Sequence, residues 1–184
     1  MKNVILLITF VLSFGIALIA ADVPKLQVQD PQHEFAGLDR CKMCHRGDRN
    51  GNIFEKWEAS PHAKAYETLA SEKSKEVYAK LGKTGNPQED PSCLKCHITG
   101  WGVDTKFTEK VKLSDGLSCE SCHFAGADYW KKSIMENREE AIKQGLNPSA
   151  EKSCVGCHNE ESPTYKEFEY DKFWKEIEHK IPAK

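Results

Sequence analysis

Outside four short repeated motifs, the 184-residue chain has few of the side chains that usually bind metals and no cysteine that could form a cross-link. All eight cysteines lie in four short motifs, so none remains for a lipid anchor behind the N-terminal apolar run. Only three methionines and seven histidines are present. No basic cluster marks a nucleic-acid surface. Beyond the N-terminus long apolar runs are scarce, so a core built from polypeptide alone would be thin.

The N-terminus has the layout of a secretory signal peptide. Lys2 precedes an uncharged, mostly apolar run from Val4 to Ala21, and Asp22 follows it. We expect residues 1–21 to be removed and residues 22–184 to form one exported domain, periplasmic or otherwise outside the cytoplasm. No membrane span would then remain. The alternative is an uncleaved anchor, because the run lies at the lower edge of bilayer-spanning length.

The cysteines follow one repeated pattern, Cys-x-x-Cys-His, which occurs four times and is the attachment signature of c-type haem. Two thiols form thioether bonds to the haem, and the adjacent imidazole binds the iron from one face. The four motifs therefore predict four covalently bound haem c groups. The cysteines are Cys41, Cys44, Cys93, Cys96, Cys119, Cys122, Cys154 and Cys157, and the proximal ligands are His45, His97, His123 and His158.

Three other readings of paired cysteines explain the pattern less well. Zinc sites use two Cys-x-x-Cys pairs but do not require a histidine after each pair. A thioredoxin-like motif predicts one pair rather than four. Disulfides suit an even count in an exported chain but leave the four histidines unexplained.

The rest of the chain predicts a mainly α fold with extensive loops and little or no sheet, a multihaem cytochrome packed around its haems. We expect helices over residues 53–59, from the Ser60 N-cap to Leu81, over 127–144 and over 165–180. Gly82 and Gly145 suit the ends of the second and third helices.

The number of histidines limits the second axial ligand of each iron. Beyond the motifs only His33, His62 and His179 remain, so at least one of four irons lacks a second histidine. Methionine is the usual substitute. Met43 lies inside the first motif and is badly placed to reach the distal face, and Met135 lies within an expected helix, where a core role is commoner.

Several segments longer than the haem motif resemble the cytochrome c-554 family of periplasmic electron carriers. They are Trp57 with Ser60-Pro61-His62-Ala63-Lys64-Ala65, Cys96-His97-Ile98-Thr99-Gly100-Trp101-Gly102, and Gly116-Leu117-Ser118-Cys119-Glu120-Ser121-Cys122-His123. The resemblance covers most of residues 35–180. It implies a helical protein with stacked haem pairs.

The resemblance also implies distal ligands. His62 would serve the third haem and His179 the fourth, while the second haem, on His97, would be five-coordinate. The family places a further histidine shortly after the third motif, where this chain has Asp128-Tyr129-Trp130. His33 is then the candidate for the first haem.

These features predict an electron carrier that works between exported redox partners, such as a dehydrogenase or quinol oxidase and a terminal reductase. We expect a monomer or weak oligomer. An alternative is a reductase of nitric oxide, nitrite or hydroxylamine at the open haem, with Glu89, Asp90 or Asp104 as proton donors. A gas-binding role or a haem filament stays open as well.

Overall fold

The computed structural model describes residues 33–148 and 151–180, and every regular element in these ranges is a helix. This confirms the predicted mainly α fold with extensive loops. The expected signal peptide lies outside the described residues. No helix in the described ranges has both the length and the apolar character that crossing a bilayer requires.

The α-helices are α1 (Leu38–Cys44), α2 (Ile53–Glu58), α3 (Ala65–Thr68), α4 (Glu72–Lys80), α5 (Pro91–His97), α6 (Thr105–Thr108), α7 (Cys119–His123), α8 (Lys132–Met135), α9 (Arg138–Lys143), α10 (Glu151–Cys154) and α11 (Tyr170–Ile177). Short 3₁₀ turns cover Asp48–Asn50, Pro87–Glu89 and Leu113–Asp115.

The expected long helices are broken into shorter ones by internal caps. Ser60 is not an N-cap, since its buried hydroxyl has no hydrogen-bond partner. Instead Ser71 caps α4 by accepting a bond from the Ser74 N–H at 3.2 Å, which separates α4 from α3. Asn137 likewise accepts from the Glu140 N–H at 3.1 Å and separates α9 from α8. A capping side chain inside an otherwise helical sequence offers the backbone an alternative to continued helix.

The last expected helix is shorter than predicted, and the expected ends at two glycines are confirmed. Residues 165–169 have no regular secondary structure, and α11 begins only at Tyr170. Gly82 and Gly145 have φ values of 70° and 104°, in the left-handed region that closes helices without steric cost to glycine.

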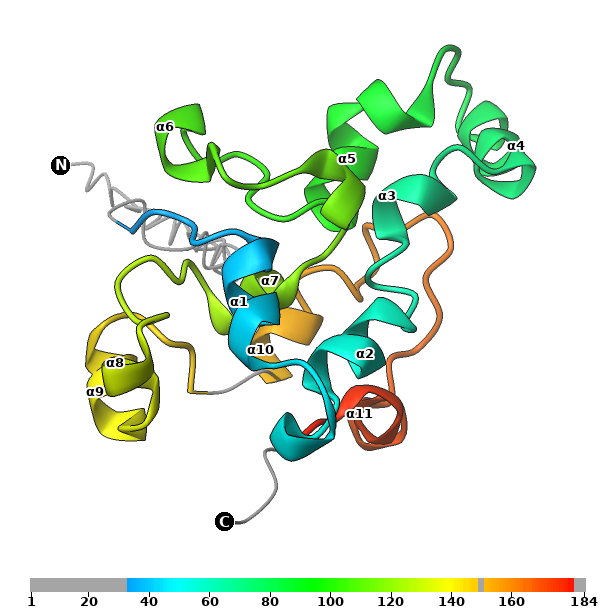
Figure 1. Cartoon of the computed structure of the whole chain (residues 1–184). Helices are drawn as coiled ribbons and strands as arrows, with labels where there is room; N and C mark the ends of the chain where they lie inside the picture. The colour runs from blue at the N-terminus through cyan, green and yellow to red at the C-terminus, as the bar shows by residue number, and fades with distance from the viewer. Residues whose placement is uncertain (1–32, 149–150, 181–184) are drawn as a thin grey trace, which may run out of the picture.

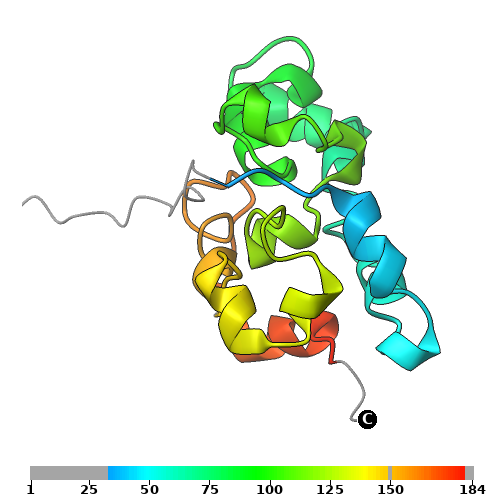
Figure 2. The same ribbon diagram turned by 60° about the vertical axis from the view of Figure 1, so that its left-hand side comes forward.

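The helices surround a central trio. Helix α7 contacts both α1 and α10, and the three lie in the middle of the molecule (Figure 1). The segment from α3 to α6 occupies one end, and α8, α9 and α11 occupy the other, as both views show (Figures 1 and 2). Each central helix carries part of a Cys-x-x-Cys-His motif, so the fold places three motifs side by side.

The apolar core of the described residues is small. One cluster contains Leu69, Leu94 and Ile98, with Tyr66 and Cys93 packed against it. Most other buried apolar side chains are scattered beside the motif helices rather than gathered in one layer. Since burial of apolar surface is the main force that stabilises a fold, so thin a core favours a structure completed by an apolar group that the polypeptide does not supply.

Asp90 joins the end of α4 to the start of α5. One oxygen caps α5 by accepting the Ser92 N–H at 2.7 Å, and the other accepts the Tyr78 hydroxyl at 2.7 Å and the Lys83 ammonium at 2.9 Å. Hydrogen bonds from Ser92, Lys83 and Tyr78 hold the pKa of Asp90 below its usual value of 3.8. Asp90 therefore fixes the helix that carries the second motif.

Replacing Asp90 with alanine should lower the melting temperature of the protein. Because the folded-state pKa lies below the unfolded value, the ionised side chain stabilises the fold above about pH 4, and this contribution fades as the pH falls further. Thermal melts from pH 7 to pH 3 should show the difference in melting temperature between the two proteins begin to narrow below about pH 4.

Asp104→Ala is the matched control, since Asp104 caps the short α6 through the Lys106 N–H at 3.0 Å. It should have the smaller effect because Asp104 lacks the tyrosine contact. An equal loss in both variants, or a gap independent of pH, would contradict the role of Asp90.

Candidate functional site

Each of the four motifs lies on, or at the end of, a short helix. In such a helix residues i, i+3 and i+4 share one face, so both thiols and the imidazole point the same way. The backbone bonds show this turn directly: the N–H of His45 donates to the carbonyl of Cys41 at 3.0 Å, and that of His158 to Cys154 at 2.9 Å. The local geometry therefore gives every motif one face with two thiols and a ring nitrogen.

Motifs 1 and 3 lie next to each other. Helices α1 and α7 pack together, and the thiols of Cys41 and Cys119 are close enough to share a hydrogen bond. This bond raises the pKa of Cys41 above its usual range and lowers that of Cys119. At the outer side of motif 1, Cys44 is exposed and the Met43 side chain is 63% exposed.

Motifs 3 and 4 are the next neighbours. Helix α7 contacts α10, and the Asn147 amide joins the two by donating to the carbonyl of Cys122 at 2.8 Å and to the hydroxyl of Ser153 at 3.0 Å. Burial, together with the nearby Cys154, raises the pKa of Cys122 to about 11. The second thiol of motif 3 thus faces the first thiol of motif 4.

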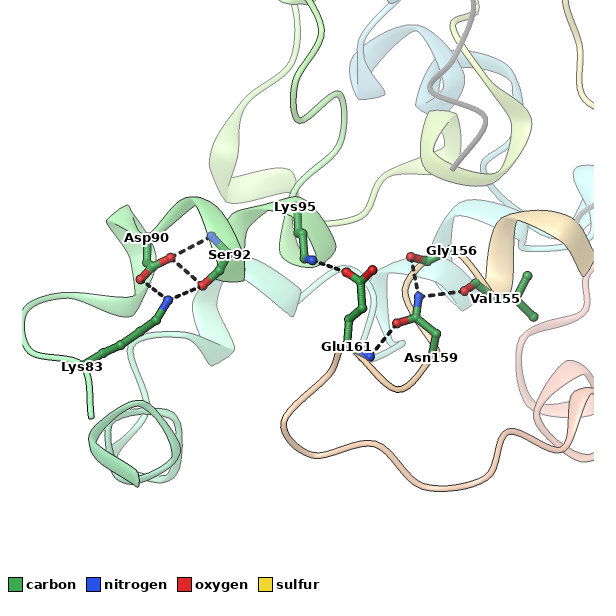
Figure 3. A network of polar contacts seen from close by, with 8 residues as sticks. All are labelled: Lys83, Asp90, Ser92, Lys95, Val155, Gly156, Asn159 and Glu161. Carbon is green, nitrogen blue, oxygen red and sulfur yellow. Dashed lines mark hydrogen bonds and ion pairs between the residues drawn. The ribbon is translucent and has the colours of Figure 1, made fainter. Parts of the chain in front are cut away.

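Motifs 4 and 2 complete the series. The thiols of Cys96 and Cys157 interact, which lowers the pKa of Cys96 to about 7 and raises that of Cys157. An ion pair joins Lys95, inside motif 2, to Glu161, just after motif 4 (Figure 3). In space the motifs therefore follow the order 1, 3, 4, 2, which differs from their order along the chain.

Figure 3 also shows how the loop after motif 4 holds Glu161 in place. The Asn159 amide donates to the carbonyls of Val155 at 2.9 Å and Gly156 at 3.0 Å, and its oxygen accepts the Glu161 N–H at 2.9 Å. In the same view Lys83, Asp90 and Ser92 form a separate network at the start of α5.

Two histidine pairs bring rings together from distant parts of the chain. The ring centroids of His62 and His158 are 6.2 Å apart, and those of His123 and His179 are 5.9 Å apart. Two imidazole nitrogens at about 2 Å from one metal ion place their ring centroids about 6 Å apart. Both separations therefore match two rings that bind one iron from opposite faces.

These pairs differ from those that the family resemblance implied. His62 lies beside the histidine of motif 4 rather than motif 3, and His179 beside that of motif 3 rather than motif 4. The sequence could not predict which motif histidine each of these rings lies beside, because that depends on how α11 and the 60–64 turn approach the central helices. His179 also lies near enough to His45 to lower its pKa, although burial is the larger cause.

His97 has a different environment. Its Nδ1 lies 2.7 Å from the carbonyl of Ala65, and it donates to that oxygen in the tautomer that leaves Nε2 available for a metal. In the described part of the chain no second imidazole packs against this ring. A single axial histidine at motif 2 stays a prediction.

His33 lies away from both ring pairs. Its Nδ1 is 2.5 Å from a carboxylate oxygen of Asp128, and the other side of its ring faces Gly145. A carboxylate on Nδ1 is the usual arrangement of a histidine whose Nε2 binds metal. Ligation by His33 stays a prediction.

Burial lowers the pKa of three motif histidines, His45, His123 and His158, which favours their neutral form. Desolvation lowers the pKa of His123 to about 4, with smaller contributions from His179 and His45, and lowers those of His62 and His158. A neutral imidazole is the form that binds iron. Sequence reasoning missed Phe168, whose ring stacks on His158 with centroids 4.6 Å apart and an angle of 19°; nothing in its sequence context indicated this contact.

The 60–64 turn that carries His62 is held by a close backbone contact with Gly116. The Leu117 N–H donates to the His62 carbonyl at 3.0 Å, and the Trp57 indole donates to the Leu117 carbonyl at 2.8 Å. A methyl group on Gly116 would lie 2.7 Å from the His62 oxygen and 2.9 Å from that of Ala63. Gly116 and Trp57 lie in segments that carry the family resemblance, but the sequence alone did not predict that they hold the His62 turn.

The donor set fits covalently bound haem c better than zinc or disulfides. None of the eight cysteines is joined to another as a disulfide in the structure. Within residues 33–148 and 151–180, no three histidine, cysteine or carboxylate side chains converge as a zinc site requires. The paired thiols, the ring separations, the neutral imidazoles and the thin core all suit an apolar macrocycle with an iron at its centre.

Comparisons with known proteins agree with this chemistry. Residues 40–124, which contain motifs 1 to 3, match the family described as cytochrome c554 and c-prime. The chain is 30% identical to cytochrome c-554 of Nitrosomonas europaea over 95% of its own length and 75% of that protein. The solved structure of reduced cytochrome c554 from the same organism superposes with a TM-score of 0.54 at 26% identity, over 78% of each chain. The chain therefore belongs to the cytochrome c554 family of c-type cytochromes, which carry covalently bound haem c and transfer electrons.

Proposed function

We propose that the protein is an exported tetrahaem electron carrier with three bis-histidine haems and one five-coordinate haem. The observation that carries the proposal is the row of neighbouring motifs in the order 1, 3, 4, 2, in which thiols pair between motifs 1 and 3 and between motifs 4 and 2, and α7 contacts α10 between motifs 3 and 4. Haem bound at these motifs supplies one-electron chemistry at iron, with potentials set by ligands, burial and hydrogen bonds.

The residues have distinct roles in this proposal. The eight cysteines bind covalently, and His45, His97, His123 and His158 are the proximal ligands. His62 binds opposite His158 and His179 opposite His123, because those rings already have the required separation. His33 serves motif 1, with Asp128 orienting its ring. His97 binds alone, oriented by the Ala65 carbonyl.

Partners and location follow from this role. The signal-like N-terminus supports export to the periplasm or an equivalent compartment. The carrier would accept electrons from an exported dehydrogenase or quinol oxidase and pass them to a terminal reductase. Exposed Met43 and Cys44 make motif 1 one point of exchange with a partner.

A nitrogen-oxide reductase is the second candidate function, and the environment of His97 favours it. The ring has no second imidazole against it in the described residues, so its iron would keep an open position for nitric oxide, nitrite or hydroxylamine. Two of the expected proton donors are poorly suited. The pKa of Asp90 is lowered chiefly by Ser92, and that of Asp104 chiefly by the Lys106 N–H, so both are ionised near neutral pH.

Spectroscopy of the purified protein tests the proposal directly. We expect four haems per chain by mass and by pyridine haemochromogen absorbance. Electron paramagnetic resonance (EPR) of the oxidised form should give three low-spin species and one high-spin species. A colourless protein, or fewer than four haems, would overturn the tetrahaem assignment.

His62→Ala should convert one low-spin haem into a high-spin haem without loss of haem content, because the opposing ligand of His158 is removed. EPR spin counting is the measurement. Met135→Leu is the control and should leave the spectrum unchanged. A spectrum of His62→Ala that matches the wild type would exclude His62 as an axial ligand.

Gly116→Ala should reproduce the spectrum of His62→Ala, at least in part. The added methyl group meets the His62 carbonyl, and the φ of 58° with ψ of −131° is strained for any residue other than glycine. Gly82→Ala is the matched control, since Gly82 also has positive φ but open space around it. If the two variants give the same EPR spectrum, the contact does not position His62.

Stopped-flow mixing of the ferrous protein with nitric oxide separates the two candidate functions. The carrier proposal predicts binding at one haem or slow reoxidation without sustained turnover. Repeated turnover with an added electron donor would favour the reductase.

A further inference from the structure

The carboxylate of Glu120 is the most deeply buried charged side chain of the described residues, and it lies between two motifs. It occupies the second position of motif 3, and its residue is 1% exposed. The same position holds Lys42 in motif 1, Leu94 in motif 2 and Val155 in motif 4; of these only the apolar Leu94 is buried, whereas Val155 is exposed. An acidic side chain buried at this place requires a specific reason, since burial of a carboxylate is costly unless its oxygens are satisfied.

Backbone donors from two distant segments satisfy those oxygens. One oxygen accepts the N–H of Ala36 and of Gly126, both at 2.7 Å, and the other accepts the N–H of Gly37 at 2.9 Å. All three partners are obligate donors, so the network matches a carboxylate that accepts only. Glu120 thereby joins the segment that leads into motif 1 to the segment that follows motif 3.

The same carboxylate faces the attachment thiols of both motifs. Its charge acts on Cys41 and on Cys119, the two cysteines whose thiols touch. It also acts on the buried Tyr129, whose hydroxyl donates to the carbonyls of His123 at 2.9 Å and Phe124 at 2.7 Å. Burial raises the pKa of Glu120, while the three backbone N–H bonds and the charge of Lys110 oppose that rise and favour the ionised form. Glu120 is thus held within the junction of motifs 1 and 3.

We propose that Glu120 is a positioning residue that holds motifs 1 and 3 in register and lowers the reduction potentials of the haem pair attached there. The inference rests on the proposed tetrahaem function. A fixed negative charge stabilises ferric relative to ferrous iron. In the low effective dielectric of a buried site this interaction is stronger than at the surface. The motif 1 and 3 pair would then be the more reducing half of the row.

The test compares Glu120→Gln with Glu55→Gln in the haem-loaded protein. Glu55 is a fair control because it lies near motif 1 and accepts the Gly47 N–H through both oxygens at 3.2 Å, but its side chain is 37% exposed and pairs with Arg46. Potentiometric titration followed by EPR should show higher midpoint potentials for two haems in Glu120→Gln. The shift should be several-fold larger than that in Glu55→Gln, because water screens the partly exposed Glu55 charge and Arg46 pairs with it.

Several results would overturn the inference. Unchanged midpoint potentials in Glu120→Gln, with all four haems present, would show that the charge does not act on the pair. An equal shift at all four haems would indicate general disruption. These results leave the tetrahaem assignment intact, whereas a wild type with fewer than four haems would fail the proposed function first.

A second variant covers the case in which Glu120→Gln does not load haem. Glu120→Asp keeps the charge and should restore haem content and low potentials. In addition, the reduced-minus-oxidised infrared spectrum of the wild type labelled with ¹³C-glutamate should contain a buried carboxylate band that Glu120→Asp, which replaces the labelled residue, removes. Absence of any such band from the wild type, or potentials in Glu120→Asp that match those of an uncharged variant, would contradict the proposal.

Discussion

The packing of α7 between α1 and α10 is the contact on which the arrangement of the site depends. It brings motif 3 against motif 1 on one side and motif 4 on the other, and motif 2 lies beyond motif 4, where Lys95 and Glu161 form an ion pair. Few apolar side chains stabilise these contacts, so hydrogen bonds and caps position the motif helices. The apolar core is small, and the apolar surface of bound haem would supply the burial that the polypeptide lacks.

Much of the chemistry was predictable because it depends on local spacing. Cys-x-x-Cys-His fixes the attachment residues within one helical turn, and counting histidines limits the axial ligands before any fold is known. The comparisons with known proteins also confirm the family resemblance. The lengths of the helices and their packing were harder to predict from the sequence. Ser71 and Asn137 each look like ordinary helical residues until their side chains are seen to cap a second helix, so two long helices were predicted where four short ones exist.

The histidine pairs show the same limit more clearly. His62 and His179 were singled out from the sequence, yet their neighbours are exchanged relative to those expected. Which motif a distant ring reaches depends on the path of loops such as the 60–64 turn, and that path is set by contacts such as Gly116 against the His62 carbonyl. Glu120 was missed because composition gives no sign that three backbone N–H groups converge on it.

The difference in solvent access between the two thiols of motif 1 has a consequence for how such a molecule could exchange charge. Cys44 is exposed, whereas Cys41 and the cysteines of the other three motifs are at least partly covered. Electron transfer between proteins requires a short distance between their cofactors, so the most exposed attachment site is the most accessible to a partner. Under the proposed loading, a redox partner would exchange electrons most readily by docking on the residues around Cys44.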